Sequence, residues 1–270
     1  MSINKFLNIK LLETVGMVSI NAGKAVMDVY KEDFQVEEKS PNHPVTKADM
    51  ISHTIIKNSL ENLLPDTFFF SEESEEISWQ ERQKWKNYWL VDPLDGTKEF
   101  IKRNGEFTIN IALINEFKPI LGVVYAPYTS KIYLAATGYG AYLKNATVTE
   151  KFLSLDDNCK LKKVNTFEKL DELRVVSSRS HKNNEKMKKW LSLQNKYRLI
   201  YSGSSIKFCL IAEGKADIYP RFRPTSEWDT AAGHCILKEA GGNVKDLENN
   251  EIQYNNKESV INPEFIASRY

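Results

Sequence analysis

One stretch, WLVDPLDGTKEF at positions 89–100, constrains the fold of this chain more than any other. The apolar run Tyr88–Val91 is rich in β-forming side chains and predicts a short buried strand. Proline has no amide hydrogen and a fixed φ, so we expect the strand to end at Asp92, before Pro93. The residues after Asp95 can then start a helix. Two carboxylates therefore sit on a bend in front of free backbone amides.

This bend has two interpretations. Carboxylates bind hard divalent cations, and the amides at a helix start bind phosphate oxygens, so the first interpretation is a metal-assisted phosphate site. The second is an ordinary reverse turn in which Asp95 only caps a helix. The stretch by itself favours the turn, and the acids found elsewhere in the chain decide between the two.

Composition narrows the class of protein. The 37 basic and 36 acidic residues nearly cancel, so no global field favours nucleic acid or an anionic membrane. The three cysteines are few and scattered, which indicates a reducing compartment without a disulfide framework. We find no signal peptide and no apolar run of about 20 residues, so we expect a cytoplasmic globular protein.

The apolar pattern predicts an α+β chain with two lobes, 1–160 and 161–270. In the first lobe, helices are expected over 3–30 and after Val45, with strands at 34–36 and 67–70 and a loop at 40–44. An antiparallel meander should follow, with strands at 107–114, 120–125, 131–136 and 141–143. In the second, α/β lobe, we expect strands at 173–177, 216–219 and 243–247 and helices at 184–193, 205–213 and 228–240.

Three further acids bear on the bend, and each has a routine structural explanation. Asp49 can close a capping box with Thr46, and Asp229 can favour the first turn of its helix through the helix dipole. Glu72 directly follows a buried strand, whereas the glutamates after it resemble a solvated acidic loop. Together with Asp92 and Asp95, however, Glu72 and Asp229 form a set of four acids that suits two or three Mg²⁺ ions.

The motifs DPLDGT at 92–97 and WDTAAG at 228–233 resemble those of the inositol-monophosphatase superfamily of Mg²⁺-dependent, Li⁺-inhibited phosphatases. Residues 88–127 and 203–221, with the closing pair Asn262-Pro263, are similar more narrowly to the bacterial 3′(2′),5′-bisphosphate nucleotidases. The resemblance runs from Asn21 to the end and weakens over 73–80 and 144–170. It implies a layered αβαβα sandwich with the metal ions between the two lobes.

The resemblance also implies roles for individual residues. Mg²⁺ would be bound by Glu72, Asp92, Asp95, Asp229 and the main-chain carbonyl of Leu94, while Asp49 and Thr97 match the pair that orients and activates a water. The substrate is expected to contact Glu72, Leu94, Asp95, Gly96, Thr97, His181, Ser204, Lys207, Arg221 and Asp229.

Four of these substrate residues match positions around the 5′-phosphate of an adenosine substrate, and each keeps a plainer explanation. Ser204 could cap a helix, Lys207 could lie on its surface, Arg221 could pair with an acid, and His181 lies on a polar loop. The other histidines, His43, His53 and His234, are interpreted as structural.

The expected activity is removal of the 3′-phosphate from adenosine 3′,5′-bisphosphate, giving AMP and phosphate, with 3′-phosphoadenylyl sulfate as a further substrate. An inositol or sugar monophosphatase with the same metal core is the alternative enzyme. A non-catalytic metal or nucleotide sensor is the alternative of another class, and the intact pair Asp49 and Thr97 argues against it. Oligomeric state and peripheral attachment to the cytoplasmic face of the inner membrane stay open.

Overall fold

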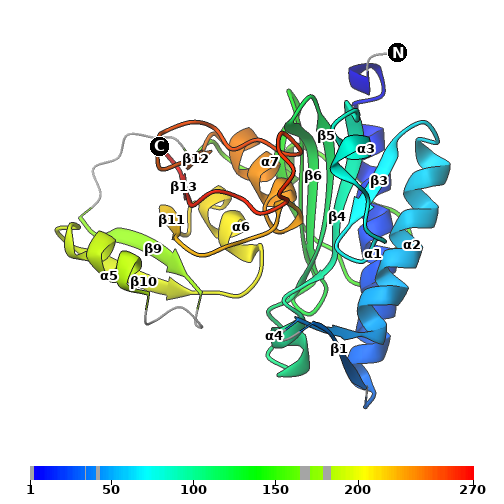
Figure 1. Ribbon diagram of the computed structural model, residues 1–270, viewed down its shortest axis with the longest axis horizontal. Coiled ribbons are helices and arrows are strands. Elements are labelled where there is room, and N and C mark those ends of the chain that lie inside the picture. Colours follow the sequence, from blue (N-terminus) through cyan, green and yellow to red (C-terminus); the bar gives the residue numbers. More distant parts are fainter. Residues whose placement is uncertain (1–2, 34, 41–42, 165–170, 179–183) are drawn as a thin grey trace.

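Alternating layers of helices and sheets make up the computed structural model, which describes residues 3–33, 35–40, 43–164, 171–178 and 184–270 (Figure 1). The first sheet has the strand order β3-β4-β5-β6-β7-β8. Its strands are β3 (Phe68–Ser71), β4 (Asn87–Asp95), β5 (Thr108–Asn115), β6 (Lys118–Ala126), β7 (Lys131–Ala136) and β8 (Gly140–Asn145). Strands β4 to β8 pair antiparallel, which confirms the predicted meander, and β3 runs parallel to β4 at the edge.

Helices cover both faces of this sheet (Figure 1). Helices α1 (Ile9–Lys31) and α2 (Lys47–Leu63) pack on one face. Helices α6 (Ile206–Ala212) and α7 (Ala231–Glu239) lie on the other, between the two sheets. A row of small residues makes room for α7, because Gly122 on β6 pairs with Ala112 on β5 and with Ala135 on β7.

The second sheet has the order β10-β9-β11-β13-β12. It consists of β9 (Leu173–Ser177), β10 (Tyr197–Tyr201), β11 (Ile218–Arg221), β12 (Asn243–Asp246) and β13 (Phe265–Ser268). Helix α5 (Glu185–Ser192) packs on its outer face, where Met187 and Leu191 meet Val175. Val176, the next residue of β9, points to the core shared with α6 and α7. The layered αβαβα sandwich is thereby confirmed.

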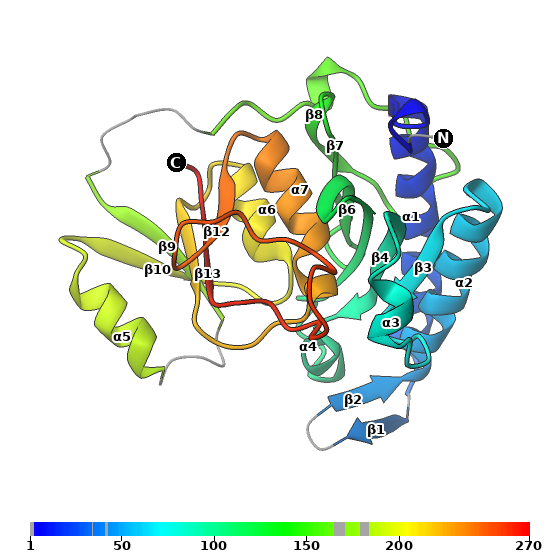
Figure 2. The ribbon, with the colours of Figure 1, turned by 45° about the horizontal axis from the view of Figure 1, so that its top comes forward.

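The remaining elements are short: η1 (Ile3–Lys5), β1 (Val36–Ser40), β2 (His43–Thr46), α3 (Trp79–Arg82), α4 (Thr97–Ile101), η2 (Asp157–Cys159) and η4 (Glu227–Asp229). The strands β1 and β2 form a hairpin that projects from the body (Figure 2). None of the helices in the described part of the chain combines the length and apolarity that crossing a bilayer requires.

Several predicted bounds are wrong. The predicted loop at 40–44 is wrong in part, because it includes strand residues of β1 and β2. Pro44 is tolerated in β2 because a two-stranded ribbon leaves one edge of each strand unpaired. The last long helix begins at Ala231, after a separate 3₁₀ turn, and β11 begins at Ile218. Strands β10 and β13 and helix α3, which are all short, were not predicted. The boundary between two lobes near residue 160 stays a prediction.

Strand β4 also differs from the prediction, because it continues through Pro93 to Asp95. The ladder with β5 breaks between Asp92 and Asp95, where the register shifts. Pro93 lies inside this bulge, so its missing amide hydrogen costs no ladder hydrogen bond. Its carbonyl accepts a hydrogen bond from the Ser52 hydroxyl over 2.7 Å, which fixes the bulge to α2.

Candidate active site and metal centre

The bulge in β4 holds both of its aspartates in defined positions. The Leu94 amide donates to Asp92 Oδ1 over 3.0 Å. The Oδ2 atom of Asp95 accepts hydrogen bonds from the Ser205 amide (2.6 Å) and from Asn110 Nδ2 (3.3 Å). Asp95 therefore links the first sheet to the turn before α6.

Asp229, from the C-terminal part of the sequence, lies next to Asp92 and Asp95. It closes the 3₁₀ turn η4 as a capping box with Ser226, whose amide donates to Asp229 Oδ2 over 2.9 Å. Asn262 braces this turn, because its Nδ2 atom donates to the Ser226 carbonyl (2.7 Å) and to Thr230 Oγ1 (3.0 Å). The sequence analysis used Asn262 only as part of the resemblance, and no local pattern predicted that it would hold Asp229.

Asp92, Asp95 and Asp229 form one cluster, in which one carboxylate oxygen of each lies within 4.8 Å of the others. Burial, followed by the charge of Glu72, raises the pKa of Asp92. Burial, followed by the charge of Asp95, raises the pKa of Asp229 to about 7. Three carboxylates this close together, one buried and two partly buried, repel one another unless protons or a cation neutralise them. Their oxygen donors at this spacing fit a hard divalent cation such as Mg²⁺.

Glu72 lies next to this cluster without joining it. It follows β3 directly, and its amide donates to the Val91 carbonyl over 3.1 Å, so its backbone runs beside Asp92. The side chain is exposed, although its charge contributes to the raised pKa of Asp92. Of the four predicted acidic ligands, the described structure therefore brings three into one group and places the fourth beside it.

Asp49 and Thr97 meet although they come from different elements. Asp49 Oδ2 accepts hydrogen bonds from the amide and the hydroxyl of Thr46, each over 2.7 Å, which confirms the capping box of α2. Thr97 Oγ1 lies 3.2 Å from Asp49 Oδ1 and 3.2 Å from the Leu94 carbonyl oxygen. Burial raises the pKa of Asp49 to about 6. One carboxylate thus serves both the helix cap and the contact with Thr97.

Glu73 is a residue that the sequence analysis assigned wrongly to the solvated loop. It is half-buried, its Oε2 atom is shielded from solvent, and its charge helps to raise the pKa of Asp49. The only available signal was its position directly after Glu72. Its neighbours Glu75 and Glu76 are exposed, as expected.

A cavity of about 340 Å³ opens beside Asp95 and Asp229. Its cationic lining includes the predicted Lys207 and Arg221 and, in addition, three residues that the sequence analysis did not single out: Lys98, Lys102 and Arg223. Gly96 and Ser204 also line it. An anionic ligand with more than one negative charge fits such a lining.

Lys207 is buried, so the alternative of a surface lysine is wrong. Its ammonium donates to the Ser204 carbonyl and lies 5.4 Å from the centre of the Tyr219 ring. Burial lowers the pKa of Lys207 to about 8, and the nearby charge of Asp95 opposes that shift. Lys207 therefore lines the cavity together with Asp95 and Asp229, and its charge interacts with theirs.

Ser204 differs from its plainer explanation as a helix cap. Ser205, not Ser204, is the residue at the start of α6, and Ser204 has a left-handed backbone with φ of 42°. The buried Ser204 hydroxyl has no hydrogen-bond partner among the described residues. Arg221 donates to the carbonyls of Arg223 (3.1 Å) and Pro224 (3.0 Å). The predicted substrate residue His181 lies outside the described residues.

Residues 10–269 match the sequence profile of the Inositol monophosphatase family. This chain belongs to that family. The chain is 46% identical to the 3′(2′),5′-bisphosphate nucleotidase CysQ of Escherichia coli (strain K12), over 96% of this chain and 100% of that protein.

Solved structures of the family share the fold. The crystal structure of CysQ from Bacteroides thetaiotaomicron superposes with a TM-score of 0.84 at 37% identity, covering 98% of this chain and 99% of the other. A structure described as IMPase/NADP phosphatase complexed with Mg²⁺ and phosphate has a TM-score of 0.70 at 20% identity, covering 91% and 85% of the two chains. The family resemblance inferred from the motifs is confirmed.

Proposed function

We propose that this chain is a Mg²⁺-dependent phosphomonoesterase that converts adenosine 3′,5′-bisphosphate to AMP and phosphate and also acts on 3′-phosphoadenylyl sulfate. One observation carries the proposal: a cluster of three aspartates, of which Asp92 is buried and Asp95 and Asp229 are partly buried, borders a cavity lined by lysines and arginines. The near full-length identity with a bisphosphate nucleotidase supports the choice of substrate.

Asp92, Asp95 and Asp229 would hold Mg²⁺, with Glu72 and the Leu94 carbonyl completing the ligand set for two or three ions. Bound Mg²⁺ supplies Lewis-acid stabilisation of the charge on the phosphoryl and leaving oxygens. The backbone amides of Gly96 and Thr97 would bind the phosphoryl oxygens. Lys207 lines the same cavity as Asp95, and its positive charge would balance part of the negative charge around the transferred phosphate.

Asp49 fixes the Thr97 hydroxyl, which would orient a water for in-line attack on phosphorus and pass its proton toward the Asp49 carboxylate. The bond between phosphorus and the 3′-oxygen breaks as the bond to the water oxygen forms, and the 3′-oxygen then takes up a proton. Arg221, Ser204 and His181 would contact the 5′-phosphate and the nucleoside. Residence in the cytoplasm stays a prediction, and peripheral membrane attachment and oligomeric state stay open.

A panel of phosphate monoesters tests this assignment. We expect phosphate release from adenosine 3′,5′-bisphosphate to exceed release from inositol 1-phosphate and fructose 1,6-bisphosphate, to require Mg²⁺ and to fall with millimolar Li⁺. A preference for inositol 1-phosphate would assign the chain to the monophosphatases instead. Turnover in excess chelator would exclude the metal-dependent reaction.

A further inference from the structure

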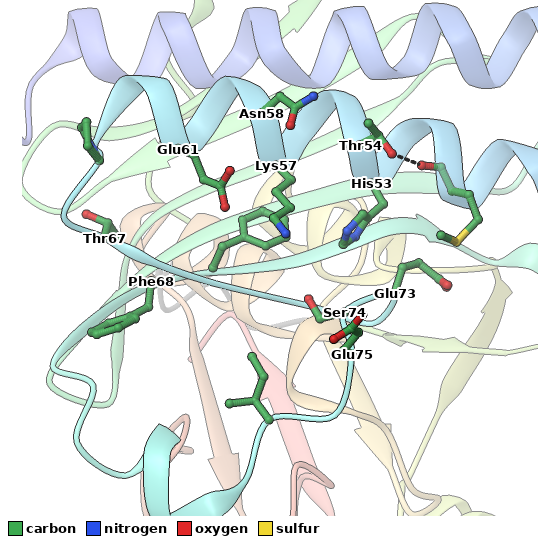
Figure 3. A pocket seen from close by; sticks show the side chains of 14 residues that line it. His53, Thr54, Lys57, Asn58, Glu61, Thr67, Phe68, Glu73, Ser74 and Glu75 are labelled. Carbon is green, nitrogen blue, oxygen red and sulfur yellow. Dashed lines mark hydrogen bonds between the residues drawn. The ribbon is translucent and has the colours of Figure 1, made fainter.

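A groove of about 1020 Å³ runs between α2 and the edge strand β3, beside the turn that carries Glu72 and Glu73 (Figure 3). His53 lines this groove from α2. It lies one helical turn after Asp49, so both side chains leave the same face of the helix. The His53 ring packs edge-on against Phe69, with a centroid distance of 5.6 Å.

His53 contacts the residue from which the acidic turn begins. Its Nδ1 atom lies 3.1 Å from the hydroxyl oxygen of Ser71, which is the last residue of β3 and is 2% exposed. That hydroxyl accepts a hydrogen bond from the Glu73 amide over 3.3 Å. The Ser71 amide donates to Ser74 Oγ (3.0 Å), and the Ser74 amide donates to the Ser71 carbonyl (2.9 Å).

Ser71 therefore closes the turn at both ends, and His53 is the side chain that holds its hydroxyl. The turn places the Glu72 backbone beside Asp92 and the Glu73 charge near Asp49. A rotation of the Ser71 hydroxyl would release the Glu73 amide and loosen the backbone of Glu72 with it.

We propose that His53 is a positioning residue, which acts through the Ser71 hydroxyl to hold the Glu72–Glu73 turn against the metal centre. Through Ser71, His53 acts on the backbone of the turn and not on the reacting atoms, so it is a positioning residue and not a catalytic one. The inference rests on the proposed function only in assigning Mg²⁺ to Glu72. Helix α2 would then support the site at two points, through Asp49 at Thr97 and through His53 at the turn.

The substitution His53→Phe keeps an aromatic ring against Phe69 and removes the polar contact. We expect the Mg²⁺ concentration for half-maximal rate to rise about fivefold, which corresponds to one neutral hydrogen bond, while KM at saturating Mg²⁺ stays unchanged. Mn²⁺ binding without substrate, followed by electron paramagnetic resonance, should weaken by the same factor. His53→Asn, whose amide can reach the position of Nδ1, should restore most of the affinity. Lys57→Ala, one turn further along the same groove, is the matched control.

A double-mutant cycle with Ser71→Ala separates positioning from a general effect on folding. If His53 acts through Ser71, His53→Phe weakens Mn²⁺ binding no further in the Ser71→Ala background. Additive losses, or unchanged Mn²⁺ affinity in both His53→Phe and Ser71→Ala, would overturn the proposal. Because Mn²⁺ binding is measured without substrate, failure of the nucleotidase assignment leaves this test intact. If His53→Phe lowers Tm, Mn²⁺ affinity is compared between His53→Asn and Ser71→Ala instead. Affinity retained in His53→Asn and weakened in Ser71→Ala supports the proposal, and any other result overturns it.

Discussion

Thr97 Oγ1 lies 3.2 Å from Asp49 Oδ1, although the two residues are 48 positions apart in the chain. The other carboxylate oxygen of Asp49 is held by Thr46 at the start of α2. Asp49 therefore cannot turn away from Thr97 without opening the helix cap. The first helix turn of α2 determines the orientation of a hydroxyl that lies in the proposed site.

The substitution Thr97→Val should lower kcat by about 10²–10⁴-fold, the usual size of a general acid–base contribution, because it removes the hydroxyl and keeps the side-chain volume. The Mg²⁺ requirement should stay the same. Steady-state kinetics over a Mg²⁺ series measures both quantities. Thr97→Ser is the control that should retain most of the activity, and a change confined to KM would mean that Thr97 only contacts the substrate.

The substitution Asp95→Asn should abolish turnover with little change in Tm, because it removes a charge from the cluster and almost no volume. Phosphate release and thermal unfolding measure the two effects. Asp28→Asn, at an exposed aspartate on α1, is the matched control and should change neither. Activity above a few per cent in Asp95→Asn would remove Asp95 from the metal ligands.

The substitution Arg221→Gln should raise KM for adenosine 3′,5′-bisphosphate about tenfold or more, the effect of losing a charge-assisted contact of about 1.5–3 kcal/mol. Hydrolysis of a small monophosphate should barely change, because Arg221 would contact only the second phosphate. Lys207→Met provides the comparison, since Lys207 acts on Asp95 and both substrates should then lose rate. Equal losses in Arg221→Gln would place Arg221 at the metal centre instead.

Gly122→Ala tests how closely α7 must approach the first sheet. A Cβ atom at this position would lie 2.5 Å from the Ala232 carbonyl oxygen and 2.8 Å from Cys235 Cβ, so α7 must move outward. We expect a loss of about 1–3 kcal/mol in the free energy of unfolding, measured by urea titration. We also expect weaker Mn²⁺ binding, because Asp229 lies just before α7. Gly138→Ala is the comparison, with open space at its Cβ position, although its φ of 84° also strains alanine. Unchanged Mn²⁺ affinity in Gly122→Ala would show that the helix can shift without displacing Asp229.

The pair formed by His234 and Glu251 predicts a loss of stability in acid. The hydrogen bond with His234, assisted by Lys238, lowers the pKa of Glu251 from 4.5 to about 2. The Glu251 carboxylate makes its full contribution to the stability of the folded state above pH 4.5, and this contribution declines as the pH falls toward 2, because the unfolded chain takes up the proton first. Glu251→Gln should therefore lower the urea midpoint at pH 7, and the difference from the wild type should narrow below pH 4.5. Glu248→Gln, at an exposed glutamate in the same region, should leave the midpoint unchanged at both values.

The three aspartates of the cluster could be selected from sequence because their motifs are local. Asp92 and Asp95 are fixed by a bend of four residues, and Asp229 by a capping box that spans 226–229. The continuation of β4 through Pro93 could not be predicted, since a bulge depends on how the neighbouring strand pairs.

Residues that depend on tertiary packing were harder to predict. The pattern around Lys207 fits an exposed helix position, and only the packing of α6 against Tyr219 buries it. Nothing in the acidic run distinguished Glu73 from Glu75, because the turn held by Ser71 decides which glutamate points inward. The short strands β10 and β13 complete a sheet whose order mixes early and late segments, which local patterns do not encode.

The brace that Asn262 provides has a consequence for the order in which the enzyme becomes active. A ribosome makes the chain from the N-terminus, so Glu72, Asp92 and Asp95 emerge long before the segment that fixes the turn of Asp229. A nascent chain that ends before Asn262 lacks the hydrogen bonds that hold the turn of Asp229. Hydrolysis of cellular phosphate esters would then begin only after synthesis has passed Asn262.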